Sequence, residues 1–138
     1  MAFRRKQYTD QALLLELNNG SLPPADFTHE AHIRLVWILR QTTSNAEQCF
    51  LEVSQIIKQY ATSIGESQIF HTTLTYASVM LVINRIERNT YDTFSTFIAH
   101  NQDLLQNFKH LINKHYSDEC LSTNEAKATV LQPDKAPF

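Results

Sequence analysis

The chain has 138 residues, of which 43% are hydrophobic, with 12 Lys and Arg against 14 Asp and Glu, six His and two Gly. A chain of this length supports one compact domain with its own core, and a formal net charge of −2 argues against nucleic-acid binding through a basic face. The two glycines, Gly20 and Gly65, stand far apart in the sequence. Walker loops and dinucleotide-binding loops need closely spaced glycines, so these phosphate-binding motifs are excluded.

The amino-acid sequence shows no signal peptide and no membrane-spanning segment. Residues 4–6 (Arg-Arg-Lys) are basic, but no long apolar run follows them, as a secretory signal would require. The longest apolar stretch, residues 77–83, is far shorter than a membrane-spanning helix. Cys49 and Cys120 lack Cys-x-x-Cys spacing, so we expect two reduced thiols. We therefore expect a cytoplasmic protein with no membrane or nucleic-acid partner, and a homo-oligomer remains an open alternative.

Helical periodicity accounts for most of the sequence, beginning near the N-terminus. The first predicted helix begins at Thr9 or Asp10 and ends before Gly20, which supplies a left-handed stop. The second begins within residues 26–28 and continues to Leu39.

Two longer helices are predicted in the middle of the chain. The third runs from Asn45 to Gly65, because Asn45 and Gln48 resemble the start of a capping box and an apolar stripe follows them. The fourth, from about residue 71 to residue 87, is apolar on most of its circumference and is expected at the centre of the fold. Six aromatic residues are expected in the core: Trp37, Phe50, Tyr60, Phe94, Phe97 and Phe108.

The last part of the chain carries weaker helical signals. A fifth segment begins at Thr90 or Asp92, and a sixth covers residues 104–112. Two prolines prevent a helix in residues 132–138. The expected fold is all-α: the whole chain forms a single-domain bundle of five or six helices, with irregular segments at residues 1–8 and 132–138.

His29 and His32 fall on one side of the second predicted helix. At about 100° per residue, Glu30 and Arg34 share the opposite side, which faces solvent, and we expect these two residues to pair. The two histidines are therefore expected to point inward.

His71 belongs to a polar strip on the fourth predicted helix, together with Thr75 and Ser78. Such a strip needs partners, because a buried imidazole or hydroxyl without a hydrogen bond costs roughly 1–3 kcal/mol. We therefore expect the strip to face His29 and His32, so that three imidazoles gather around one pocket. The other histidines are expected at the surface or rim: His100, His110 and His115.

Three imidazoles around one pocket fit three interpretations. They could ligate a divalent transition metal as cofactor, serve in acid–base chemistry or anion binding near two helix N-termini, or hydrogen-bond within a structural network. His29 and His32 are three residues apart, so the His-Glu-x-x-His metalloprotease motif is absent although Glu30 follows His29. The spacing permits a shared metal ion without requiring one.

Three motifs in this chain resemble a group of small, helical bacterial proteins of unassigned function. The motifs are Phe27-x-His29-x-x-His32-x-Arg34-x-x-Trp37, Phe70-His71-x-Thr73-x-Thr75, and Pro133-Asp134-x-x-Pro137. The resemblance covers most of the chain from Phe27 onward. The chain departs from the group at Tyr76, where a tryptophan is expected, and at Phe70, where a tyrosine is common.

The resemblance implies no reaction, but it does imply that six residues act as one constellation. These are His29, His32, His71, Thr73, Thr75 and Arg34. The histidines would be metal ligands or acid–base groups, and the threonines would orient the imidazoles or contact the ligand. Arg34 would also contact the ligand or, if its helix is packed on both sides, pair with Asp134.

We therefore expect a histidine-lined pocket between the second and fourth helices that binds a metal ion or a small polar ligand, with an enzymatic role left open. The alternative is a protein-interaction or assembly module in which the histidines are structural. A cavity at the histidines favours the first function, and a contiguous exposed apolar patch without such a cavity favours the second.

Overall fold

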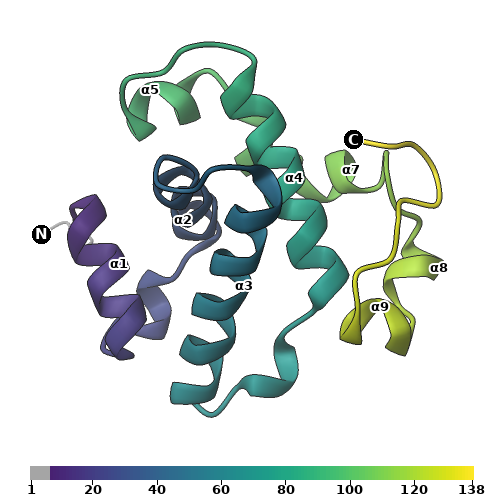
Figure 1. Ribbon diagram of the computed structural model, residues 1–138, viewed down its shortest axis with the longest axis horizontal. Helices are drawn as coiled ribbons and strands as arrows, with labels where there is room; N and C mark the ends of the chain where they lie inside the picture. Colours follow the sequence, from purple (N-terminus) through teal and green to yellow (C-terminus); the bar gives the residue numbers. More distant parts are fainter. Residues whose placement is uncertain (1–6) are drawn as a thin grey trace, which may run out of the picture.

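The computed structural model describes residues 7–138, which form α-helices and two short 3-10 helices but no strand. This confirms the all-α class. Three long helices pack side by side, α2 (His29–Arg40), α3 (Ala46–Ser63) and α4 (Thr72–Glu87), and α1 (Asp10–Asn19) packs mainly against α3 (Figure 1). The remaining elements are η1 (Pro24–Asp26), η2 (Ser67–Ile69), α5 (Phe94–Ala99), α6 (Asp103–Gln106), α7 (Phe108–Ile112), α8 (Asp118–Leu121) and α9 (Asn124–Ala128).

Polar side chains cap the starts of the first three α-helices where the sequence predicts them. The side chains of Thr9, Thr28 and Asn45 each accept a hydrogen bond from a backbone N–H in the first helical turn. The capping box at Asn45 is only half formed, because the Gln48 side chain accepts from Ser44 instead of returning to Asn45. These caps fix where each helix begins.

Gly20 and Gly65 follow α1 and α3 with φ values of 76° and 74°. Side chains with a Cβ rarely adopt this left-handed conformation, so both positions favour glycine. The two predicted helix stops are therefore confirmed.

α4 lies at the centre of the molecule, as predicted, and packs against α2, α3, α7 and α9. Of the aromatic side chains expected in the core, Phe94 and Phe108 are only half-buried and the other four are buried. The largest fully buried side chains come from all parts of the described chain: Leu13, Leu17, Leu22, Leu35, Val53, Val79, Val82, Ile83, Phe97, Leu104, Ile112 and Tyr116.

The prediction of five or six helices is wrong for residues 7–138, in which nine α-helices are found. The predicted sixth segment splits into α6 and α7 at Asn107, whose backbone (φ −132°, ψ 30°) leaves the helical region. The fifth helix begins after Thr93 rather than at Thr90 or Asp92. Additional short helices, α8 and α9, follow where no helix was predicted.

The C-terminal segment after α9 is irregular and crosses the surface as a strap. Its Leu131 carbonyl accepts from the Tyr116 hydroxyl, and the Lys135 N–H donates to the His115 carbonyl. Phe138 stacks on the His115 ring, with 4.0 Å between ring centroids. The predicted irregular tail at residues 132–138 is thus confirmed, whereas residues 1–6 of the other predicted irregular segment lie outside the described residues.

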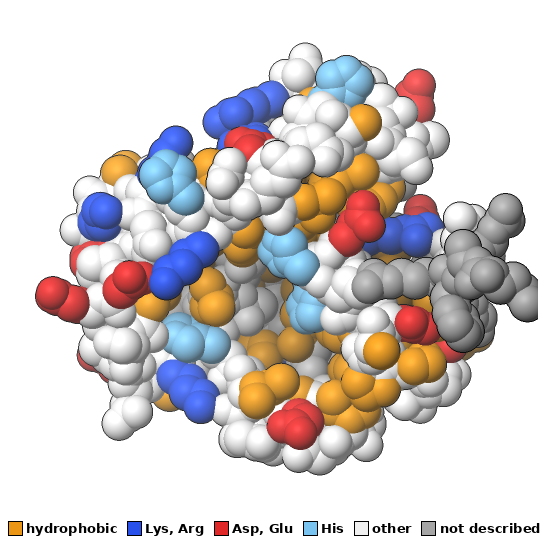
Figure 2. Space-filling view, turned by 180° about the vertical axis from the view of Figure 1, so that it is seen from behind, with side chains coloured by type: hydrophobic (Ala, Val, Ile, Leu, Met, Phe, Trp, Pro, Cys, Tyr) orange, Lys and Arg blue, Asp and Glu red, His pale blue; other side chains and the backbone are white. Residues whose placement is uncertain are grey.

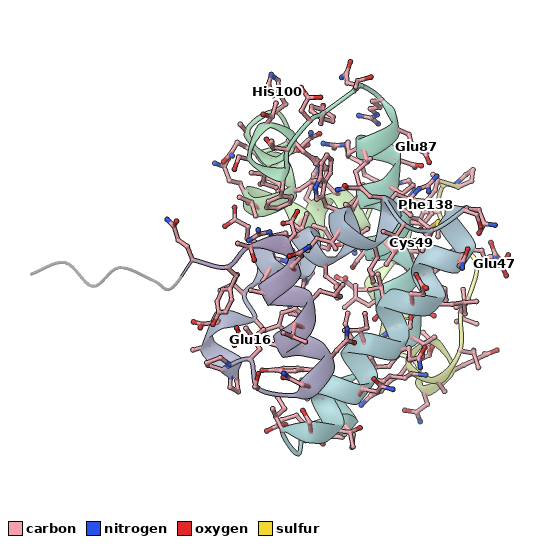
Figure 3. All side chains as sticks on the ribbon, turned by 60° about the vertical axis from the view of Figure 1, so that its left-hand side comes forward. Glu16, Glu47, Cys49, Glu87, His100 and Phe138 are labelled. Atoms are coloured by element: carbon pink, nitrogen blue, oxygen red, sulfur yellow. The ribbon has the colours of Figure 1, made fainter. Side chains whose placement is uncertain are left out.

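No helix within residues 7–138 has the length and apolar character needed to cross a membrane. Both cysteines are free thiols, as expected. Cys49, near the start of α3 (Figure 3), is buried, and burial raises the pKa of its thiol.

Candidate functional site

A large hollow opens on the face of the molecule seen in Figure 2, where hydrophobic side chains form its floor and histidine side chains lie around it. Its volume is about 930 Å³, near the upper end of the range of small-molecule sites. Side chains of α2, α3 and α4 line one side, and side chains of α7 and α8 close the other. The apolar lining includes Ile33, Val36, Val53, Ile57, Val79, Val82 and Ile112.

His29, His32 and His71 all line this hollow, as the sequence predicts. One ring nitrogen of each lies 2.7–2.8 Å from a backbone carbonyl: Nε2 of His29 from Leu104, Nδ1 of His32 from Thr28, and Nε2 of His71 from Leu121. A carbonyl oxygen can only accept, so that nitrogen carries the proton in each ring. The other nitrogen of a neutral imidazole then offers a lone pair.

In His71 this second nitrogen is already used. Nδ1 accepts from the backbone N–H of Leu74 at 3.0 Å and thereby caps the N-terminus of α4. Nε2 meanwhile donates to Leu121 in α8. Because both ring nitrogens are engaged, His71 holds two elements together and has no lone pair left for a ligand or metal.

His32 is the histidine best placed to bind a ligand. Its ring stacks on Phe27, with 3.7 Å between centroids and planes 8° apart. Burial lowers the pKa of His32 below its ordinary value of 6.5, so the ring is neutral at pH 7. Nε2 has no hydrogen-bond partner among residues 7–138 and borders the hollow that the ring lines.

His29 stands further out and is exposed. Its ring meets Phe108 edge-on at 4.6 Å between centroids, and its Nε2 ties α2 to the start of α6. Nδ1 is therefore the ring nitrogen of His29 that remains able to hydrogen-bond a ligand, at the mouth of the hollow.

Metal binding at the three histidines receives no support. Within residues 7–138 no group of three His, Cys, Asp or Glu side chains is arranged to hold an ion. Zinc sites use at least three protein ligands, and His71 has no nitrogen to contribute.

The two predicted threonines have separate roles. Thr75 lines the hollow, but its hydroxyl donates to the His71 carbonyl one turn back in α4. Thr73 is fully buried outside the hollow, where its hydroxyl donates to the Thr129 carbonyl and accepts from the N–H of Leu131. The prediction that Thr73 contacts the ligand or orients an imidazole is therefore wrong, because it anchors the C-terminal strap.

Arg34 lies away from the histidines, beside a second hollow between α1, α2 and the start of α5. Its guanidinium binds Asp10 of α1, with 2.6 Å between Nη2 and Oδ1. The predicted pairing with Glu30 is wrong, since the partner comes from another helix. Pairing with Asp134 is also wrong, because that carboxylate accepts from the N–H and hydroxyl of Ser117. The six residues thus do not form one constellation.

Two of the remaining histidines are exposed, as expected. His100 projects at the outer edge of the molecule (Figure 3), and His110 is exposed on α7. His115 is half-buried instead, because Phe138 stacks on it and the Ala136 carbonyl accepts from its Nδ1.

Sequence reasoning missed the size and apolar character of the hollow. Phe27, which belongs to the first motif, and Phe108, which is expected in the core, both help to line it. Apolar residues that line a cavity have the same helical period as residues that fill a core, so the sequence holds no local signal for the difference.

Comparisons of this chain with protein-family models, with curated proteins and with solved structures give no match. The resemblance to small bacterial proteins therefore stays a prediction.

Proposed function

We propose that this protein binds a small, largely apolar molecule in the hollow between α2, α3 and α4. The observation that carries the proposal is the hollow itself, about 930 Å³ in volume, with an aliphatic floor and His32 in its wall. The proposed site is the histidine-lined pocket that the sequence predicts between the second and fourth helices. The ligand differs from the expected metal ion or polar molecule, because most lining side chains are hydrocarbon.

The energetics favour such a ligand. Burying apolar surface contributes about 25 cal/mol per Å², so a ligand that hides about 300 Å² gains roughly 7 kcal/mol before the entropy of association is subtracted. A strongly polar ligand would lose hydration in this hollow and recover few hydrogen bonds. This gain alone corresponds to a Kd of roughly 10 μM, and the entropy of association weakens binding further, so a hydrophobic molecule should bind with a Kd above about 10 μM.

A second candidate function is docking of an apolar segment from another protein. Ile69 and Leu74 line the hollow and are 66% and 40% exposed. Exposed apolar residues beside a cavity are typical of interaction sites. The cavity at the histidines favours the small molecule, and the experiment below distinguishes the two.

The test is binding of Nile red, a neutral dye whose fluorescence rises in apolar surroundings. We expect saturable binding with one site per chain. Ser78→Phe should weaken it at least tenfold, because Ser78 lines the hollow and the new ring would occupy it. Ser78→Ala, which removes only the hydroxyl, should bind as the wild type does.

A matched surface control is Gln55→Phe, since Gln55 is exposed on α3 and lines neither hollow. It should leave dye binding unchanged. Dye binding that is absent, or that is equal in wild type and Ser78→Phe, would contradict the small-molecule function and favour the docking of a partner segment.

A further inference from the structure

The hydrogen-bonding groups around the hollow are unequally distributed between donors and acceptors. Three hydroxyls donate to backbone carbonyls: Tyr60 to Leu22, Thr75 to His71 and Ser78 to Leu74. The Asn113 amide donates to the Tyr116 carbonyl and to Asp118. The protonated nitrogens of all three imidazoles also donate to carbonyls. The side-chain donors that line the hollow's interior are therefore already used.

Acceptors remain available on the same walls. One of them is Nε2 of His32, in a half-buried ring held between Phe27 and the hollow. The hydroxyl oxygens of Thr75 and Ser78 each donate their proton and keep lone pairs. Among the side chains of the interior, a ligand therefore meets groups that accept hydrogen bonds but do not donate them.

Among residues 7–138, the charged side chains that line the hollow lie toward its mouth. Lys109 and Asp118 border the hollow, are both exposed and carry opposite charges. Lys58 stands over the Phe70 ring at 4.9 Å and is also exposed. Water screens exposed charges, so a carboxylate placed deep in the hollow would lose hydration without gaining a counter-ion or a donor.

We propose that the ligand is uncharged and donates an O–H or N–H hydrogen bond to Nε2 of His32, as an alcohol, phenol or neutral amine attached to a hydrocarbon body would do. This inference rests on the proposed function and specifies the ligand's chemical class. It excludes fatty acids and other carboxylates as the preferred ligands, although their hydrocarbon parts would fit equally well.

The test compares three ligands that share one hydrocarbon part: 4-hexylphenol, 4-hexylanisole and 4-hexylbenzoate. Each displaces Nile red, which has no O–H or N–H, at pH 7.5. We expect the phenol to bind about five- to tenfold more tightly than the anisole, which lacks the donor. The benzoate should bind more weakly than both.

His32→Phe keeps an aromatic ring against Phe27 and removes the acceptor. The Thr28 carbonyl still accepts from the backbone N–H of residue 32, so the substitution does not leave this carbonyl without a hydrogen bond. In this variant the phenol should lose its advantage over the anisole, while the affinity for the anisole changes less than about twofold. The comparison of ligands on the wild-type chain tests the same point without any variant.

The outcomes distinguish failure of the proposed function from failure of the inference about the ligand's chemical class. Failure of Nile red to bind would overturn the proposed function. Dye binding with equal affinities for phenol and anisole would overturn only the inference about the ligand. Tighter binding of the benzoate, lost in Lys109→Gln, would also overturn it and place the ligand's polar group at the mouth.

Discussion

At the scale of single residues, the imidazole of His71 links two parts of the fold. It caps α4 through Nδ1 and holds α8 through Nε2. A polar residue that lines a cavity can thus be structural even though its position suggests ligand binding. His32 on α2 is also a histidine that lines the hollow, but its Nε2 has no hydrogen-bond partner within residues 7–138.

His71→Ala should lower the free energy of unfolding by about 2 kcal/mol, because it removes a helix cap and a hydrogen bond to a carbonyl. His71→Asn should recover about half of this loss, since Asn is a good cap but is too short to reach Leu121. Urea unfolding at pH 7.5 measures both. His110→Ala, at an exposed position, is the control and should be neutral. Equal losses in the Asn and Ala variants would argue against the capping role.

His32 should make stability depend on pH. Burial lowers its pKa in the folded chain below 6.5, the value expected when unfolded. Just below pH 6.5 the unfolded chain therefore binds more protons than the folded chain, so the free energy of unfolding decreases as the pH falls through this range. His32→Phe should make the decrease between pH 7.5 and pH 5 smaller, as measured by urea unfolding. His110→Phe should leave the slope unchanged, and a slope equally steep in His32→Phe would refute the assignment.

At the scale of elements, the residue pattern predicts the long helices well. Local signals suffice there. Thr9 and Asn45 cap the N-termini of α1 and α3, Gly20 and Gly65 end these helices, and the residues between show apolar helical periodicity. No helix is predicted at α8 or α9, because these helices are only four and five residues long and carry too little periodicity. Contacts between distant segments, such as Thr73 with the strap, have no local signature at all.

Thr73→Val should release the C-terminal strap. The side chain keeps its shape, but the Thr129 carbonyl and the Leu131 N–H both lose their partner. We expect a loss of about 1–3 kcal/mol in the free energy of unfolding and faster amide hydrogen exchange in residues 130–138. Thr62→Val, at an exposed position of α3 whose hydroxyl bonds within the helix, is the matched control. Unchanged exchange in residues 130–138 would show that the strap is held by other contacts.

Arg34 and Asp10 should couple α2 to α1. A double-mutant cycle with Arg34→Gln and Asp10→Asn should give a coupling energy of about 1 kcal/mol, because the pair is partly exposed. The same cycle with Arg34→Gln and Asp134→Asn should be additive, since Asp134 binds Ser117. Coupling in the second cycle and none in the first would restore the pairing expected from the sequence.

At the scale of the whole molecule, the hollow is formed by segments far apart in the chain. One side of its wall comes from α2, α3 and α4, and the other side comes from α7 and α8. Two hydrogen bonds help to hold the helices of the first side to the C-terminal segments: His29 donates to the Leu104 carbonyl, and His71 donates to the Leu121 carbonyl. A ligand seated there would contact both sides and would bind the folded chain alone. Ligand binding and global stability should therefore be linked.

This linkage gives a prediction for thermal unfolding. At a free ligand concentration of 100 times Kd, stability should increase by about 2.7 kcal/mol. For a domain of this size, 1 kcal/mol shifts Tm by roughly 4 °C, so 4-hexylphenol should raise Tm by about 10 °C in calorimetry. Ser78→Phe, with the hollow filled, should show no shift at the same concentration, whereas Gln55→Phe should respond as the wild type does. A rise of equal size in Ser78→Phe would place the ligand elsewhere on the folded chain, and a fall in Tm in all three would mean that the ligand binds the unfolded chain more strongly.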